Sequence, residues 1–473
     1  MEKFKNQSHS MGTDSIPRLM IRFSLPAIVG MLANALYNIV DRIFVGQTIG
    51  PIGIGAISVA FPFMLLAIAY GLLIGVGGGA LISISLGEKR RARAEKIMGN
   101  ALVFLVGGGL LLSIGGALYS GEILDLTGAS VTMMPLAKEY MDIAVWGIFF
   151  SLIGFGFNFF IRAEGNPRYA MYTLILGAFA NILFDWLFII GMDMGIRGAA
   201  IATVISQALS ALWAGAYYVR KMGILRFRLK NLRPDGVVIG RILAVGLAPC
   251  LTEVSFTFVL ALFNRILRTY GGDLAISAMG IFFSLDSLLF LPVLGLAGGV
   301  QPIIGYNYGA RDYGRVISSV KVALGMASLF FAVSFLIIMI MPEPMIRIFN
   351  SDDAALLALA VRGLRIGYSG VIFASVSIIA SHTFQAIGKA KMGIFLTLSR
   401  HFIFIFVPLY FLPPHFGTDG VWMAIPLSDL GGGIMAAWFL KREFRLLRER
   451  RRLQQIFPPE HQPEPRGETS LVS

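Results

Sequence analysis

The chain is poor in cysteine, histidine and charge, and each shortage excludes a class of protein. Its one cysteine, Cys250, allows no internal disulfide and no cysteine-based metal or redox pair. The five histidines show no metal-ligand spacing. Charged residues make up 14% of the 473 positions, against roughly 25% in an ordinary soluble domain. Since no stretch is polar enough to fold in water, soluble enzymes and extramembrane receptor domains are excluded.

What the chain has instead is hydrophobic sequence, at 56% of residues and a mean hydropathy of +0.74. Apolar runs of about 20 residues, the length that crosses a bilayer as a helix, recur along the whole chain. They predict an all-α polytopic membrane protein with twelve transmembrane helices. The predicted spans lie at about 16–46, 52–86, 94–119, 132–161, 168–190, 197–220, 237–268, 273–308, 314–341, 354–386, 390–412 and 418–440.

The charge balance predicts the topology. Lysine and arginine number 40 against 27 acidic residues, a net charge of +13 that could indicate a nucleic-acid partner. The basic residues gather on alternate loops, however, for example at about 89–96 and 220–233, whereas the opposite loops carry mostly acids. By the positive-inside rule both termini are cytoplasmic, and we expect no nucleic-acid partner. The tails are then residues 1–15 and 441–473, the second basic and, from about 457, disordered.

The two halves of the chain repeat each other. At an offset of about 222 positions, small residues of the first half fall on identical residues of the second half. Because six helices return the chain to its starting side, the repeats must be parallel, related by a pseudo-two-fold axis along the membrane normal with a cavity between them. The predicted division is a six-helix bundle at 16–220, a cytoplasmic linker at 221–236 and a second bundle at 237–440. The matched pairs include Ala56 and Ala278, Gly77 and Gly299, Gly87 and Gly309, Gly195 and Gly417, Gly198 and Gly420, and Ser206 and Ser428.

Polar residues inside the first predicted span lie on one helical face. Asn34, Tyr37, Asn38 and Asp41 follow the spacing i, i+3, i+4 and i+7. Such groups can hydrogen-bond to neighbouring helices and serve packing alone, and this reading stays open for the two asparagines. An intramembrane carboxylate is costly without a use, so Asp41 favours a functional reading.

Three further polar residues of the first half fall at a similar depth. Asp41 and Asp185 lie roughly 28 and 26 Å along their spans from the cytoplasmic ends, and Thr203 lies about 9 Å inward from the outer end of the sixth span. Asn181 shares a helical face with Asp185. Carboxylates, an amide and a hydroxyl at one height suit a proton or a hard cation such as sodium. We therefore predict an ion-coupling site at Asp41, Asn181, Asp185 and Thr203.

Other positions give weaker indications. Pro26, inside the first span, removes a backbone hydrogen bond and should kink the helix, either as a hinge or as a static bend. In the second half, Glu253 and His382 are the deepest lone ionisable groups, with Gln385 as a polar neighbour. A histidine satisfied by packing is as plausible as a proton carrier, so these three are secondary candidates.

With these residues identified, the chain resembles the multidrug and toxic compound extrusion (MATE) family over about 14–445, and most closely its DinF-like branch. One departure is Ala163, which stands where the family's pattern before the fifth helix has glycine. The stretches that carry the resemblance are Leu36-Tyr37-Asn38-Ile39-Val40-Asp41, Arg162-Ala163-Glu164-Gly165-Asn166, Asn181-Ile182-Leu183-Phe184-Asp185 and Gly195-Ile196-Arg197-Gly198-Ala199-Ala200.

The resemblance implies export of amphipathic or cationic small molecules from the cell in exchange for protons or sodium, with no other cofactor. It places Asp41, Asn181, Asp185 and Thr203 in the coupling site. It also places substrate-binding residues at Asn34, Tyr37, Asn38 and Asn158. Another branch of the family has acids on helices seven and ten. Glu253 matches the first of them, whereas the region of Ser377 has none for the second.

Three alternatives remain at this stage. A lipid-linked precursor flippase of the same superfamily would be expected to line its cavity with basic residues, whereas the buried sites here are acidic. A major-facilitator transporter also has six plus six helices, but its usual Asp-Arg pair is missing from the loop that begins at Gly87. An intramembrane enzyme would need a nucleophile or metal set that the spans do not show. The prediction is a monomeric, multi-pass plasma-membrane transporter and not an enzyme.

Overall fold

The computed structural model describes residues 10–347 and 354–456 of the chain. Within these ranges the regular structure is helical and contains no strand. Twelve helices in the described part are long and apolar enough to cross a membrane. The predicted fold class, an all-α polytopic membrane protein, is confirmed. The stretch from 457, predicted to be disordered, and the first nine residues lie outside the described ranges.

The first six spans begin and end within a few residues of the predicted limits. Several have a proline in the first turn. Proline has no backbone N–H, and N–H groups in the first turn make no intrahelical hydrogen bond, so proline costs no bond there. A short helix and a π-helical segment complete this half. The elements are α2 (Ile16–Thr48), α3 (Pro51–Gly87), α4 (Arg91–Leu118), α5 (Ser120–Leu126), α6 (Met134–Ala163), α7 (Pro167–Asp185), η1 (Trp186–Gly191) and α8 (Gly195–Val219).

The second half begins with a 74-residue helical element that contains two predicted spans. Gly272, with φ of +61°, separates them. The last helix runs sixteen residues past the predicted end at 440, because the basic segment continues it to Ile456. The elements are η2 (Leu229–Leu232), α9 (Gly236–Gly309), α10 (Tyr313–Ile340), α11 (Pro342–Arg347), α12 (Ala354–Gly367), η3 (Tyr368–Gly370), α13 (Val371–Ala386), α14 (Ala390–Leu398), η4 (Ser399–Ile403), α15 (Phe404–Phe411), α16 (Pro413–Phe416) and α17 (Thr418–Ile456).

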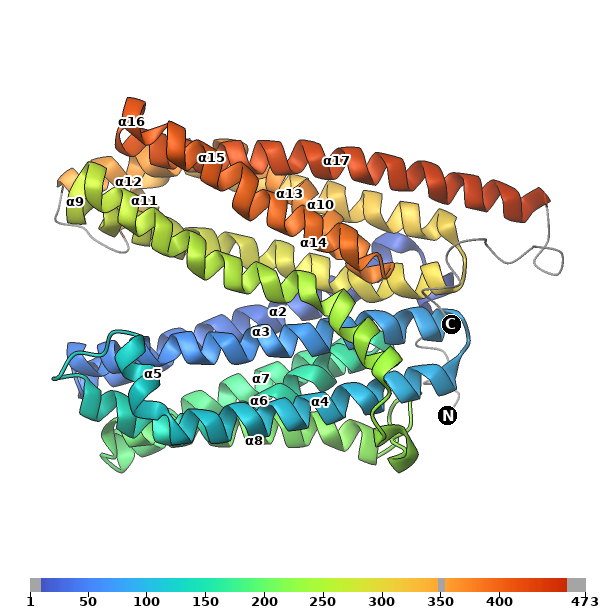
Figure 1. Cartoon of the computed structure of the whole chain (residues 1–473), viewed down its shortest axis with the longest axis horizontal. Coiled ribbons are helices and arrows are strands. Elements are labelled where there is room, and N and C mark those ends of the chain that lie inside the picture. Colours follow the sequence, from blue (N-terminus) through green and yellow to red (C-terminus); the bar gives the residue numbers. More distant parts are fainter. Residues whose placement is uncertain (1–9, 348–353, 457–473) are drawn as a thin grey trace.

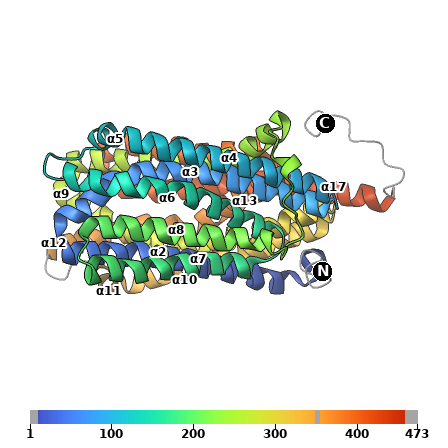
Figure 2. The same cartoon turned by 90° about the horizontal axis from the view of Figure 1, so that it is seen from below.

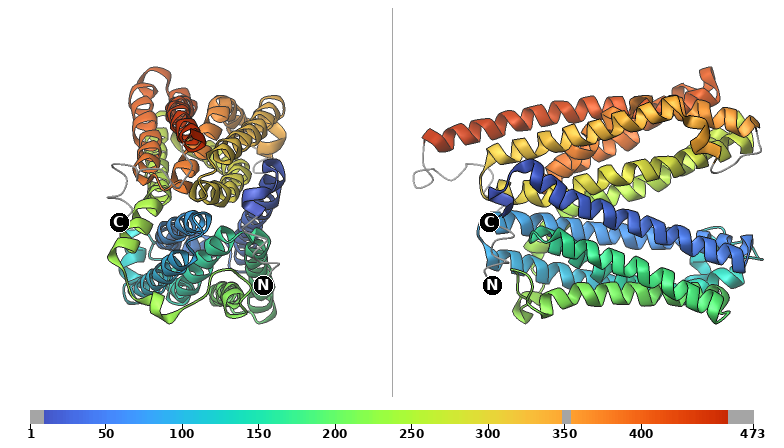
Figure 3. Two further views of the ribbon diagram at one scale, coloured as in Figure 1. Left: turned by 90° about the vertical axis from the view of Figure 1, so that its right-hand side faces the viewer. Right: turned by 180° about the vertical axis from the view of Figure 1, so that it is seen from behind.

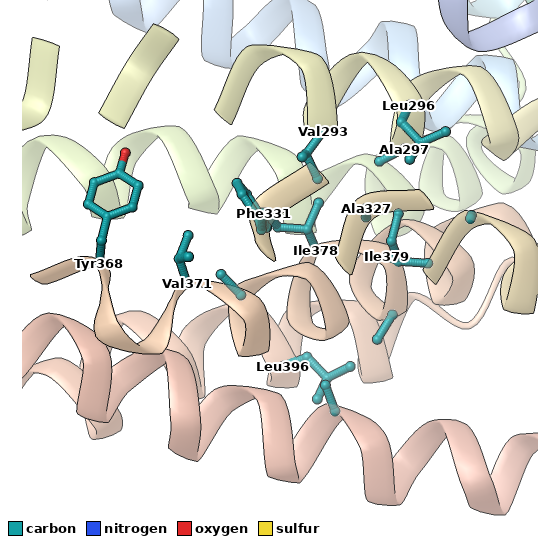
Figure 4. Close-up of a cluster of buried hydrophobic side chains, with 14 of the residues drawn as sticks. Val293, Leu296, Ala297, Ala327, Phe331, Tyr368, Val371, Ile378, Ile379 and Leu396 are labelled. Atoms are coloured by element: carbon teal, nitrogen blue, oxygen red, sulfur yellow. The ribbon is translucent and has the colours of Figure 1, made fainter. Parts of the chain in front are cut away.

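The helices form two bundles, called here the N lobe (α2 to α8) and the C lobe (α9 to α17), which lie one above the other in Figure 1. Each lobe has its own hydrophobic core. Figure 4 shows part of the C-lobe core, where Leu296, Phe331 and Ile379 come from three different helices. The start of α2 and the end of α17 lie at the same end of the molecule, as an even number of spans requires (Figures 1 and 3).

The first helix of each half crosses into the opposite lobe. Before Pro26, α2 contributes Met20 and Phe23 to the C-lobe core. The start of α9, before Pro249, contributes Ile242 to the N-lobe core. The division of the chain at 221–236 stays a prediction, but the cores do not separate there. Packing passes from one lobe to the other at a proline in both helices.

Two glycines matched by the internal repeat allow these crossings. A Cβ at Gly77 would lie 2.2 Å from the carbonyl oxygen of Ile242, and one at Gly299 would lie 2.7 Å from the Cα of Ser24. Only a residue without a side chain lets the backbones come this close. These two glycines, matched by the repeat, therefore lie on the surface where the lobes meet.

The linker between the halves is fastened to the N lobe. The buried carboxylate of Glu164 accepts hydrogen bonds from the backbone N–H groups of Ile224 (2.5 Å) and Leu225 (3.1 Å). The buried Glu95 pairs with Arg228 Nε at 2.9 Å. Burial raises the pKa of Glu164 to about 7, although the two backbone N–H groups act against that shift. The linker is thus part of the N-lobe surface.

Candidate functional site

Two buried carboxylates meet where α2 and α7 pack together. Asp41 is 8% exposed and Asp185 is fully buried. Their side chains lie within hydrogen-bonding reach of each other. Asp41 Oδ1 and both carboxylate oxygens of Asp185 have no hydrogen-bond partner. Two ionised carboxylates cannot donate to each other, so a proton or a cation between them would satisfy atoms that the protein leaves unpaired.

The backbone changes type at this position. α7 is α-helical up to Asp185, and the six residues that follow, from Trp186, form a π-helical turn. π-helical turns shift the hydrogen-bond register and are frequent at functional sites. One turn earlier, Asn181 is 1% exposed and neither atom of its amide group has a partner. Together with Asp41 and Asp185, it presents unpaired oxygens of the kind that hard cations prefer.

Two tyrosines and a threonine surround the pair. Tyr37 lies close to both carboxylates and to the side chain of Asn38. Tyr140 on α6 lies close to both carboxylates and to the side chain of Thr203 on α8. The structure thus brings Thr203 to the cluster through Tyr140. Sequence reasoning missed Tyr140, although its place six residues after the start of α6 puts it at the depth of Thr203.

The predicted substrate residues separate into two groups. Asn34 and Asn38 lie on the same face of α2 as Asp41, and the side chain of Asn38 donates to the carbonyl of Asn34 at 2.8 Å. Asn158 is not brought to this cluster. Its amide group donates to the carbonyl of Ala170 (2.6 Å) and to the hydroxyl of Thr173 (2.7 Å), which ties α6 to the first turns of α7. Pro26 is buried within α2, which continues through it as a helix.

The secondary candidates of the second half are partly engaged in packing. His382 Nδ1 lies 3.0 Å from the carbonyl oxygen of Ile378, one turn earlier on α13. Gln385 donates to Ser381 at 3.1 Å, while its own amide oxygen has no partner. Glu253 is half-buried on α9.

A polar cluster that sequence reasoning missed lies in the C lobe. Arg400 Nη2 donates to the Asp429 carboxylate at 2.8 Å, and the Tyr368 hydroxyl donates to the Asp286 carboxylate at 3.1 Å. The two pairs lie close enough to interact electrostatically. A signal was present, because Asp429 stands at the repeat position of Gln207, directly after the matched serines.

Comparison with known proteins identifies the family to which this chain belongs. The MatE family model matches the chain twice, at residues 26–187 and 249–411. The chain is 27% identical over 415 residues to "Multidrug export protein MepA" of Staphylococcus haemolyticus (strain JCSC1435), covering 88% of this chain and 91% of that protein. It is 26% identical over 412 residues to the MepA protein of Staphylococcus aureus (strain N315), covering 87% of this chain and 90% of that protein.

Solved structures share the fold. One is described as the outward-facing conformation of a multidrug resistance MATE family transporter of the MOP superfamily, with a TM-score of 0.88, 23% identity and coverage of 93% of this chain and 98% of that chain. Another, a MOP superfamily transporter from Pyrococcus furiosus, has a TM-score of 0.87 at 23% identity and the same coverage. The family model matches both halves and most of the chain. This multi-pass membrane protein therefore belongs to the MatE family.

Proposed function

We propose that the protein is a secondary active exporter that moves amphipathic or cationic small molecules out of the cell in exchange for protons or sodium. Family membership and the names of its relatives support this proposal. The observation that carries it is the buried pair Asp41 and Asp185, whose oxygens are left unpaired. Among the described residues neither carboxylate forms an ion pair, although Arg42 is close enough to interact electrostatically with Asp41. A group of this kind binds a proton or a cation from solution.

Occupying the pair would couple ion entry to export. An empty, charged pair attracts a cationic substrate toward the N lobe, whereas an occupied pair is neutral and does not. Moving a two-state transporter from mostly one state to mostly the other needs about 5.5 kcal/mol of preference in ion binding. Pro26 is a suitable hinge for that change, because it marks the point where α2 leaves the C-lobe core.

The same proposal covers topology and assembly. The protein lies in the plasma membrane as a monomer, with the ends of α2 and α17 that carry the tails on the cytoplasmic side. The basic loops on that side support this orientation.

The test uses the purified full-length chain in proteoliposomes. Export of a fluorescent organic cation is measured while proton and sodium gradients are imposed separately. Asp185→Asn should reduce gradient-driven export to background and leave a folded protein. Asp125→Asn, which removes an exposed acid, is the matched control and should export normally. Normal export by Asp185→Asn, or transport confined to a polyanionic lipid precursor, would overturn the proposal.

A further inference from the structure

A cavity of about 640 Å³ lies between the first turns of α2 and the turn that joins α6 to α7. It is at the other end of α2 from Asp41, so it is separate from the site described above. Figure 2 shows α2 and α7 running side by side from this end. The residues that line it are Pro17, Arg18, Ile21, Arg22, Gly165, Asn166, Pro167 and Arg168.

The lining is strongly basic. It contains three arginines and no acidic residue. Arg22 has one distant carboxylate partner, Asp14 at 3.5 Å. Among the described residues, neither Arg18 nor Arg168 forms an ion pair. The N-terminal turn of α7, a 19-residue helix, adds partial positive charge to the same cavity. An anion is the ligand that this charge distribution favours.

The cavity also has an apolar side. Ile21 lines it and is 59% exposed, and Leu25 one turn further along α2 is 56% exposed. On α7, Tyr172 is 52% exposed one turn after Arg168. Exposed apolar side chains on a membrane-spanning helix are suited to contact with lipid acyl chains. A free inorganic anion would make no use of this wall.

Helix length places the cavity at the membrane surface. The 33 residues of α2 span about 50 Å, whereas the hydrocarbon core of a bilayer is about 30 Å thick. The first turns of α2 therefore reach the headgroup layer, where basic pockets between helices bind anionic lipid headgroups.

We propose that this cavity binds the phosphate headgroup of an anionic phospholipid from the leaflet nearest the start of α2. Arg18 and Arg22 contact the phosphate from α2 and Arg168 contacts it from α7, while one acyl chain follows Ile21 and Leu25. The lipid joins the two helices that hold Asp41 and Asp185, at the end opposite to that pair, and stabilises their packing.

The experiment measures lipid binding to the purified full-length protein by native mass spectrometry. The probes are phosphatidylglycerol, phosphatidylcholine and inorganic phosphate alone. We expect phosphatidylglycerol to bind at least about tenfold more tightly than phosphatidylcholine. The double variant Arg18→Gln/Arg168→Gln should lose that preference. Its control, Arg442→Gln/Arg445→Gln, removes two exposed arginines on the same side of the membrane outside the cavity and should keep it.

A second measurement locates the lipid. A photoreactive residue at Ile21 should cross-link phosphatidylglycerol, whereas one at Leu111, which is 73% exposed on α4, should cross-link far less. Equal binding of the two lipids, equal losses in the test and control variants, or equal cross-linking at both positions would overturn the site. Binding of inorganic phosphate as tight as that of phosphatidylglycerol would show that a free anion, and not a lipid, is the ligand.

Discussion

The two lobes share one fold and treat the aspartates buried within their spans in opposite ways. In the C lobe, Asp429 has Arg400 at 2.8 Å and Asp286 accepts a hydrogen bond from Tyr368. In the N lobe, Asp41 and Asp185 face each other with unpaired oxygens, and neither forms an ion pair with a described residue, although Arg42 acts on Asp41 electrostatically. A buried carboxylate that is paired with a side chain of the protein has a structural role. A buried carboxylate without such a partner depends on an ion from solution for charge compensation.

This difference suggests a division of labour after duplication. The backbone of one repeat was kept in both halves, and the charges diverged. The C lobe holds its buried Asp429 in an ion pair with Arg400. The N lobe, under the proposed function, provides the site whose charge changes during transport.

The largest effect is expected from the same substitution made in each lobe. Asp41→Asn should reduce gradient-driven export at least about tenfold, because the pair then cannot take up a charge-compensating ion. Asp286→Asn should keep most of the export, because an asparagine oxygen still accepts the Tyr368 hydrogen bond. Uptake assays in proteoliposomes measure both. Equal losses in the two variants would remove the functional distinction between the lobes.

The second prediction concerns stability, for which we expect the C-lobe substitution to have the larger effect. Arg400→Gln leaves the buried Asp429 without its counter-charge, which should lower the free energy of unfolding by about 3–5 kcal/mol. The double variant Arg400→Gln/Asp429→Asn should recover most of that loss. Thermal unfolding of the purified protein, with Asp185→Asn as the N-lobe counterpart, provides the measurement. A double variant no more stable than Arg400→Gln alone would contradict the assignment of this pair.

A third prediction uses the linker, which only the N lobe fastens with a buried glutamate. Around residues 163–165 the repeat offset is 223, with Ala163 matching Ala386, so the repeat position of Glu164 in the C lobe is Ile387. Because burial raises the pKa of Glu164 from 4.5 to about 7, the folded protein holds a proton that the unfolded chain releases. Stability should therefore fall as the pH rises through this window, by about 3 kcal/mol at most. Melting temperatures at about pH 5 and pH 8 should differ less in Glu164→Gln than in the unmodified protein, and an unchanged difference would refute this role.

The smallest effects test the two crossings of the first helices. Gly77→Ala and Gly299→Ala should each destabilise the protein by about 1–3 kcal/mol, because the new methyl group would clash with backbone atoms. At Gly77 these atoms belong to α9, and at Gly299 they belong to α2. Gly77→Ala should lower the free energy of unfolding more than Gly299→Ala, because its added Cβ would lie closer to the neighbouring backbone (2.2 Å against 2.7 Å). Gly107→Ala, with open space around the new atom, is the control and should be neutral or slightly stabilising. Melting temperatures provide the comparison, and three equal values would mean that the crossings are not tightly packed.

Sequence reasoning alone determined the number and place of the spans, the duplication, and the helical face shared by Asn34, Tyr37, Asn38 and Asp41. All of these depend on local periodicity and on distance along a helix, which any single sequence displays. The sequence also predicted that Asp41 and Asp185 lie at the same depth in the bilayer. Depth can be estimated from the number of residues between each aspartate and the cytoplasmic end of its helix, because both helices cross the same bilayer.

Only the tertiary structure decided which helix packs against which. It placed the start of α2 in the C-lobe core, brought Tyr140 close to Thr203, turned Asn158 toward α7, and gave Asp429 its partner Arg400. These features depend on the rotation of each helix about its axis and on its neighbours in the bundle. Hydrophobic periodicity determines neither the rotation nor the neighbours. A membrane-spanning helix packs against lipid on some faces and protein on others, so apolar residues occur on nearly every face.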